Sequence, residues 1–323
     1  PALENVGIRK FFNGPEAFTP DTNYLLGETP EVKNFYVCCG FNSIGIQSAG
    51  GAGKVTAEWM MNDEVNEDLY SLDISRFEKF HSETKFITER VTESLGDLYA
   101  MHWPYKQHKS SRNIKLFPFH NDLKKKGACF GQVAGFERPM WYALNGKKPE
   151  YDYSYGYQNW YDAAKYETIN TRENAGLFDL SSFAKFEIKG VTAFNDLQRL
   201  CCNNIKNNPG DTTYTQMLNS NGGIVADLTV TCIDNDSFRI VTGSSVREHD
   251  KKHILKNLSK NTTLIDITES LACFGVFGPK SREILTEIFG EHFSKNNFKF
   301  GTVKEISFKN DKLILQRLSF VVE

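Results

Sequence analysis

The sequence predicts an α+β protein with more than one domain, and three observations support this prediction. The chain has 323 residues, which is enough for two or three domains that each bury a core. Short apolar runs between Gly, Pro and Asn turns alternate with stretches in which apolar residues recur at helical spacing. In the second half of the chain, two alternating runs flank the sequence Asn-Ser-Asn-Gly-Gly, which is typical of an antiparallel hairpin.

Charge and cysteine usage exclude several classes of protein. The formal net charge is −2 with both signs interspersed, so we expect neither nucleic acid nor an anionic membrane as the main partner. No apolar run approaches the roughly 20 residues that cross a bilayer, and no signal peptide is seen, so we expect no membrane insertion. The seven cysteines show no CxxC pair and no metal-like spacing to histidine. This pattern predicts reduced thiols, no metal site, and a bacterial cytoplasm or a mitochondrial matrix.

The first candidate site lies where a strand over residues 34–39 gives way to a helix that we expect over residues 55–61. The glycine-rich stretch 40–54 joins these two elements. Glycine lets a backbone approach a ligand closely, and the free N–H groups at a helix start favour negative charge. The stretch is therefore a candidate for binding a phosphate or a polar cofactor ring. Tight packing of the helix on the sheet is the alternative, and this stretch alone leaves both open.

The section that follows is expected to contribute helix and core. Apolar residues recur at broadly helical spacing between residues 69 and 99, and core packing explains them. We interpret the basic stretch 104–139 as a solvated face, with an anion site as the alternative. Residues 151–161 are crowded with tyrosine and tryptophan, which indicates a surface insertion anchored by its rings, with stacking on a planar ligand as the alternative.

A new unit is predicted to begin near residue 160. We expect a helix that ends at Gly176, then two strands about a Ser-Ser turn, then another helix, over residues 165–175, 177–180, 183–188 and 191–200. Further on, Ser245 to Glu248 fits a capping box for a helix through Leu258. A helix over residues 281–288 is expected to follow Gly278-Pro279.

The hairpin carries the second candidate site. Its strands are expected over residues 213–218 and 224–230. Apolar residues alternate onto one face of the second strand, which puts Asp227 on the opposite face. An ordinary exposed carboxylate is the alternative to a functional one at this position.

Several motifs occur in order along the chain and together resemble one family. They include NGP at 13–15, TPD at 19–21, CGFNS at 39–43, FERPMWY at 136–142, GLFDLS at 176–181, MLNSNGGIVADLTV at 217–230 and GVFGPKSREIL at 275–285. This series is similar to the FAD-dependent sarcosine and dimethylglycine dehydrogenases. The resemblance implies the C-terminal part of a flavin domain over 1–70, a central linker domain over 71–158, and the N-terminal part of a folate-binding domain like the glycine-cleavage T-protein over 159–323. It also implies that the ADP-binding part of the flavin domain precedes residue 1, so that the chain looks like a piece of a longer protein.

The resemblance also implies cofactors and roles for particular residues. FAD and tetrahydrofolate are the implied cofactors. The flavin-side residues that match the motif are Gly40, Asn42, Ser43, Gly45 and Ile46. Asp227 matches the acid that contacts the folate amine, where a carboxylate can stabilise positive charge and move a proton.

The chain ends in a segment that departs from the family pattern. Glu323 matches an acid that binds the pterin in that family. Phe320 stands where many members have tyrosine, and Val322 replaces a glycine. Both departures weigh against pterin contact by this segment, because Phe320 has no hydroxyl and valine is poorly accommodated at positive φ.

The implied activity is oxidative demethylation of sarcosine or dimethylglycine, with transfer of the one-carbon unit to tetrahydrofolate. The implied partners are a small N-methyl amino acid and an electron-transfer flavoprotein. Two alternatives remain. One is a non-catalytic relative like the regulatory subunit of pyruvate dehydrogenase phosphatase. The other is a folate-dependent aminomethyltransferase without flavin activity.

Overall fold

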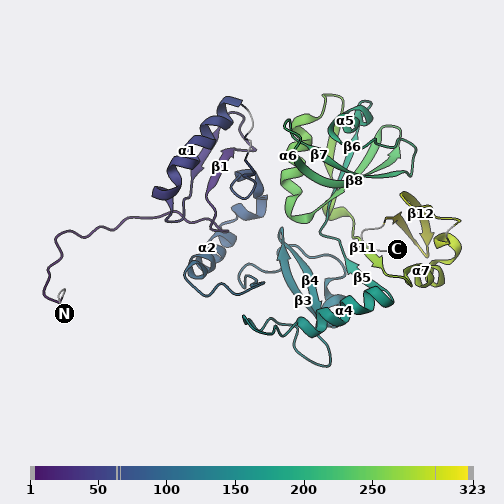
Figure 1. Ribbon diagram of the computed structural model, residues 1–323, viewed down its shortest axis with the longest axis horizontal. Helices are drawn as coiled ribbons and strands as arrows, with labels where there is room; N and C mark the ends of the chain where they lie inside the picture. Colours follow the sequence, from purple (N-terminus) through teal and green to yellow (C-terminus); the bar gives the residue numbers. More distant parts are fainter. Residues whose placement is uncertain (1–3, 63–64, 66, 295, 319–323) are drawn as a thin grey trace. The chain divides into compact units, whose positions relative to one another are not determined.

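The computed structural model describes residues 4–62, 65, 67–294 and 296–318 (Figure 1). The chain folds into two compact units, Pro1–Met101 and His102–Glu323. Helices and strands occur in both units, which confirms the predicted α+β class. The three-part division at residues 70 and 158 stays a prediction. Among the helices of the described ranges, none is long and apolar enough to cross a lipid bilayer.

The first unit is built on a two-stranded antiparallel sheet with a long helix against it. Its elements are β1 (Leu25–Glu28), β2 (Tyr36–Cys39), α1 (Gly45–Asn62), η1 (Ile74–Arg76), η2 (Lys79–Ser82) and α2 (Thr84–Leu98). Leu26 of β1 is fully buried. The Trp59 ring of α1 lies over Gly27, where an added Cβ would come within 2.6 Å of the ring. Gly27 therefore lets the helix pack closely on the sheet, and its φ of +99° also favours glycine.

The start of α1 corrects the sequence-based prediction. The helix begins at Gly45, ten residues before the expected start, so Gly50, Gly51 and Gly53 lie inside it rather than in the turn. Each glycine costs a helix about 1 kcal/mol relative to alanine. Burial of Ala52 and Trp59 on the sheet side of the helix offsets that cost. The helical stretch expected between residues 69 and 99 is also divided, into η1, η2 and α2.

The second unit opens with a small hairpin and a helix. These elements are α3 (His120–Lys125), β3 (Ala128–Val133), β4 (Phe136–Tyr142) and α4 (Tyr161–Glu173), and β3 pairs with β4. Two further antiparallel pairs follow, β5 (Gly176–Asp179) with β11 (Phe274–Phe277) and β12 (Thr302–Phe308) with β13 (Asp311–Arg317). The helix α7 (Ser281–Phe289) and η5 (Gly290–Phe293) lie between β11 and β12 in the chain.

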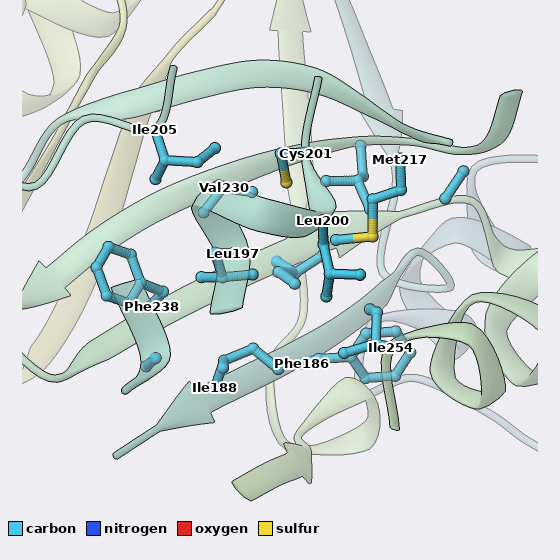
Figure 2. Close-up of a cluster of buried hydrophobic side chains, with 14 of the residues drawn as sticks. Phe186, Ile188, Leu197, Leu200, Cys201, Ile205, Met217, Val230, Phe238 and Ile254 are labelled. Atoms are coloured by element: carbon cyan, nitrogen blue, oxygen red, sulfur yellow. The ribbon is translucent and has the colours of Figure 1, made fainter. Parts of the chain in front are cut away.

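A five-stranded antiparallel sheet holds the main core of this unit. Its order is β10 (Thr263–Asp266), β6 (Ala184–Lys189), β9 (Ser237–Thr242), β8 (Ile224–Asp234) and β7 (Thr212–Leu218). The connecting helices are α5 (Ala193–Leu200), η3 (Ser244–Val246) and α6 (Arg247–Asn257), and η4 (Thr268–Ser270) follows β10. Figure 2 shows Leu197 of α5 and Ile254 of α6 among the buried strand side chains Phe186, Ile188 and Val230. The two helices therefore cover one face of the sheet.

One predicted turn of this unit is confirmed, and two predicted helix boundaries differ in the structure. The two strands around Ser181 and Ser182 exist as β5 and β6, but each pairs with other strands. The predicted turn at Ser181 and Ser182 forms, closed by a hydrogen bond of 3.0 Å from Phe183 N to Leu180 O. Both serines are buried in it and bonded, Ser181 with Cys273 and Ser182 with Ser244.

The helix boundaries also differ from the expectation. Gly176 begins β5, and α4 ends at Glu173 with Asn174 as its C-cap residue. The helix α6 begins at Arg247, with Val246 as its N-cap residue, and continues directly from η3, so Ser245 is not the N-cap residue that the capping box predicts. Arg247 instead donates a hydrogen bond of 2.9 Å to Asp266.

Candidate functional site

Asp227 lies on the face of the five-stranded sheet opposite the helices. Its neighbours Ala226 and Leu228 are buried in the core, whereas Asp227 is exposed. The predicted alternation of faces is therefore confirmed, although Ile224 at the start of the strand is exposed as well. Part of the same sheet face is covered elsewhere, because the Gln316 amide of β13 donates to Thr212 and Thr231. Asp227 remains open to solvent.

Two side chains of the neighbouring strand hold the Asp227 carboxylate. Tyr214 Oη donates to Asp227 Oδ2 at 2.9 Å, and Gln216 Nε2 donates to Oδ1 at 3.3 Å. Gln216 is the register partner of Asp227 in the β7–β8 ladder, and Tyr214 lies two residues before Gln216 in β7, on the same face. Both carboxylate oxygens thus have one donor each and keep lone pairs for a ligand.

The hydrogen bond between Tyr214 and Asp227 also affects the phenol. It raises the pKa of Tyr214 above its ordinary value, because the carboxylate stabilises the protonated hydroxyl. Tyr214 therefore stays a hydrogen-bond donor across the neutral range. Sequence reasoning did not find Tyr214 or Gln216. The alternation of β7 was the available signal, since alternate residues of β7 share a face with Asp227.

The glycine turn forms the second candidate site, in the first unit. Gly40, Asn42, Ser43, Gly45 and Ile46 all lie between the end of β2 and the first turn of α1. Gly40, Asn42 and Ser43 have φ of +68°, +48° and +67°, so the chain turns sharply into the helix. The first turn of α1 holds no acidic residue, and the Ile46 side chain is fully exposed. The helix start thus presents N–H groups and an apolar side chain outward.

Asn42 differs from the other residues of this turn because its side chain points inward. It is 3% exposed; its Oδ1 accepts a hydrogen bond of 2.8 Å from Thr19 N, and its Nδ2 donates one of 2.7 Å to Gly40 O. Asn42 therefore holds the turn in shape. The same segment is tied down by Asp21, whose carboxylate pairs with Arg76 at 2.7 Å. The TPD and CGFNS motifs meet through these contacts.

Two other predicted features have structural explanations. Glu137 of the FERPMWY motif is buried, and its carboxylate binds Arg112 through both oxygens and accepts a hydrogen bond of 2.8 Å from Asn113 N. All seven cysteines lie within the described ranges and carry free thiols. Glu323, the predicted pterin acid, lies outside the described residues, as do Phe320 and Val322.

Two family models match the chain. The GCVT N-terminal domain matches residues 119–323, and the FAD dependent oxidoreductase central domain matches residues 62–116. Together these matches follow the order expected from the sequence motifs.

Similarity to curated proteins extends along the whole chain. The whole chain aligns with a 4-methylaminobutanoate oxidase (formaldehyde-forming) from Paenarthrobacter nicotinovorans at 40% identity, and the aligned part is 39% of that protein. It is 33% identical over its full length to 40% of the mitochondrial sarcosine dehydrogenase of Homo sapiens. It is also 32% identical to the mitochondrial pyruvate dehydrogenase phosphatase regulatory subunit of Mus musculus. That alignment covers 95% of this chain and 36% of the relative. The chain thus spans about two fifths of the length of these relatives.

Proposed function

This chain belongs to the family of FAD-dependent sarcosine and dimethylglycine dehydrogenases, and from that membership we propose that the protein oxidatively demethylates an N-methyl amino acid. We further propose that its GCVT N-terminal domain takes up the released one-carbon unit on tetrahydrofolate. The observation that carries the second step is the exposed Asp227 carboxylate, held at both oxygens by Tyr214 and Gln216.

The residues at the start of α1 fit a flavin. FAD, when bound, supplies the acceptor for the hydride equivalent that leaves the N-methyl carbon. The exposed Ile46 side chain suits contact with a flat ring, and the N–H groups at Gly45 and Ile46 suit partial negative charge. In this proposal Gly40 and Ser43 shape the turn beside the ring, and the buried Asn42 side chain holds the turn through its hydrogen bond to Gly40 O.

The surroundings of Asp227 fit the amine of tetrahydrofolate. Tetrahydrofolate supplies the nitrogen that accepts the one-carbon unit. An exposed carboxylate attracts a positively charged amine and can receive its proton. The donors Tyr214 and Gln216 fix the orientation of the carboxylate before a ligand arrives, which lowers the entropy that binding must overcome. Glu323 remains a proposed pterin contact.

The identity of the N-methyl substrate is a finer proposal. We propose sarcosine or dimethylglycine. The relative with 40% identity over the whole chain favours a second candidate, a longer N-methyl amino acid such as 4-methylaminobutanoate, with the carbon released as formaldehyde. The similarity to a phosphatase regulatory subunit supports the non-catalytic alternative, which predicts no turnover of any of these amines. An electron-transfer flavoprotein is the proposed electron acceptor, in a bacterial cytoplasm or a mitochondrial matrix.

The first test is an anaerobic visible spectrum of the full-length protein before and after each amine is added. We expect sarcosine, dimethylglycine or 4-methylaminobutanoate to bleach the flavin band. Free formaldehyde should fall when tetrahydrofolate is present. A flavin that none of the three amines bleaches would contradict the demethylase proposal and support the regulatory alternative. A bleached flavin with formaldehyde release unaffected by tetrahydrofolate would support the formaldehyde-forming candidate.

The second test is Asp227→Asn in the full-length protein. We expect amine-dependent flavin reduction to continue at the wild-type rate, because Asp227 lies in the folate-binding domain. Folate-dependent capture should fall by roughly 100-fold, the scale of losing a positioned proton acceptor. The measurements are stopped-flow flavin reduction and quantified methylene-tetrahydrofolate. Equal loss of both half-reactions would defeat the assignment of Asp227 to the folate step.

A further inference from the structure

The side chains of Cys202, Gln216 and Asp227 form a row across the outer edge of the five-stranded sheet. The segment 201–203 runs beside the outer strand β7, and Cys201 forms an isolated antiparallel bridge with Met217. In the next ladder Met217 pairs with Ala226 and Gln216 pairs with Asp227. Cys201 and Met217 point into the core (Figure 2). Since side chains alternate along a strand, Cys202, Gln216 and Asp227 share the opposite, outer face.

The middle residue of this row contacts both of the others. Gln216 Nε2 donates to Asp227 Oδ1 at 3.3 Å, and Gln216 Oε1 accepts from Cys202 Sγ at 3.6 Å. The backbone of the same pair is also joined, because Cys202 N donates to Gln216 O at 2.9 Å. A rotated amide would turn its oxygen toward the carboxylate and its NH₂ group toward the thiol. The observed orientation gives Asp227 a donor and gives the thiol an acceptor.

We propose that Gln216 and Cys202 are positioning residues for Asp227, an inference that rests on the proposed folate role of that carboxylate. Gln216 fixes Oδ1 while Tyr214 fixes Oδ2, so the plane of the carboxylate is determined by two donors from one strand. Cys202 acts through Gln216 by holding its amide oxygen away from Asp227. Among the described residues, no lysine, arginine or histidine forms an ion pair with Asp227, so these neutral donors set its orientation.

The test compares variants of the full-length protein in two measurements. One is the rate of one-carbon capture on tetrahydrofolate, and the other is tetrahydrofolate affinity by anaerobic calorimetry. Gln216→Leu should slow capture about 10-fold, as expected for one lost hydrogen bond to a charged group, and change affinity by less than about threefold. Gln216→Glu keeps the side-chain shape but opposes two carboxylates, so capture should fall further than in Gln216→Leu.

Cys202 provides the matched pair of variants. Cys202→Ala removes the donor to the Gln216 amide and should slow capture about threefold. Cys202→Ser retains a donor and should restore a rate close to wild type. A purely structural role for this exposed residue would make the two variants alike. Thermal unfolding of each variant shows whether the fold is intact.

The outcomes separate this inference from the proposed function. If Asp227→Asn abolishes capture while Gln216→Leu and Cys202→Ala leave it unchanged, the inference is overturned and the function stands. Equal losses in Cys202→Ala and Cys202→Ser would also overturn the role of Cys202. If Asp227→Asn has no effect on capture or affinity, the proposed function fails, and the positioning role fails with it.

Discussion

Single residues in this chain show how one charge can be kept in the interior by its neighbours. Glu137 is 3% exposed, and burial alone would raise the pKa of its carboxyl. Hydrogen bonds from Arg112 and from Asn113 N outweigh burial and hold that pKa below its ordinary value. Asp227 represents the opposite case, because it is exposed and its neutral neighbours orient it. The first carboxylate is structural, and the second is available for chemistry.

The depressed pKa of Glu137 predicts a pH dependence of stability. A carboxyl with a lowered folded pKa contributes stability above the unfolded value, near 4.3, and that contribution is lost as pH falls through the folded pKa. In Glu137→Gln, the free energy of unfolding should therefore fall less steeply as the pH is lowered. Arg112→Leu should destabilise by about 3 kcal/mol at pH 7, because it leaves a buried charge unpaired. Urea unfolding between pH 3 and pH 7 measures both.

An exposed ion pair provides the control for these variants. Lys148 and Glu150 lie 3.8 Å apart with side chains 83% and 68% exposed. Glu150→Gln should change the unfolding free energy by less than about 0.5 kcal/mol. If Glu137→Gln leaves this pH dependence unchanged, the role assigned to the buried pair is refuted.

Most of the helices and strands could be predicted from the sequence, and the predictions that were wrong have physical reasons. The hairpin of β7 and β8 and the outward position of Asp227 could be predicted from the turn and the alternation. The partner of Asp227 could not be obtained by counting from the turn. A bulge between Met217 and Leu218 shifts the register by one residue, so Gln216 rather than Thr215 faces Asp227.

Other features depend on tertiary packing that a local pattern does not contain. The early start of α1 required knowledge that Ala52 and Trp59 are buried on the sheet. The strand β5 pairs with β11, which lies almost a hundred residues further along the chain, and β6 pairs with β9 and β10 rather than with its neighbour β5. The inward turn of Asn42 toward Thr19 is likewise a contact across 23 residues. These long-range contacts override local preference.

Glycine positions give a prediction at this scale. Gly190 follows β6 with φ of +143°, and an added Cβ would come within 1.9 Å of Asn261 O. Gly190→Ala should destabilise by about 2–4 kcal/mol, since both the backbone conformation and the close contact would be strained. Gly53 lies inside α1, where an added Cβ would meet nothing within 4 Å. Gly53→Ala should stabilise the chain by about 0.5–1 kcal/mol, and chemical denaturation of the two variants compares them. Similar effects of both would contradict the interpretation of Gly190.

The whole molecule divides at residue 101, between two units that each have their own buried residues. Tyr99 and Met101, next to this division, are 79% and 55% exposed. Exposed segments between compact units are favoured sites of proteolysis. The division therefore has a consequence that needs no cofactor to observe.

Limited digestion with chymotrypsin should cut after Tyr99 and leave a resistant fragment that begins near residue 100. Tyr99→Ser should slow that cut without changing cleavage at other exposed aromatic residues. Mass spectrometry of the fragments over time identifies the sites. If digestion proceeds evenly through the second unit and no fragment that begins near residue 100 accumulates, the division is contradicted.

The segment 201–203 has a consequence for solubility. An outer strand such as β7 exposes unpaired N–H and C=O groups that can recruit a strand from another molecule and start aggregation. The bond from Cys202 N to Gln216 O, and the bridge between Cys201 and Met217, occupy part of that edge. Displacement of this short segment would remove the contacts that orient Asp227. It would also expose the unpaired backbone groups of β7, to which a strand of another molecule can bind. Inactivation and precipitation would then share one structural origin.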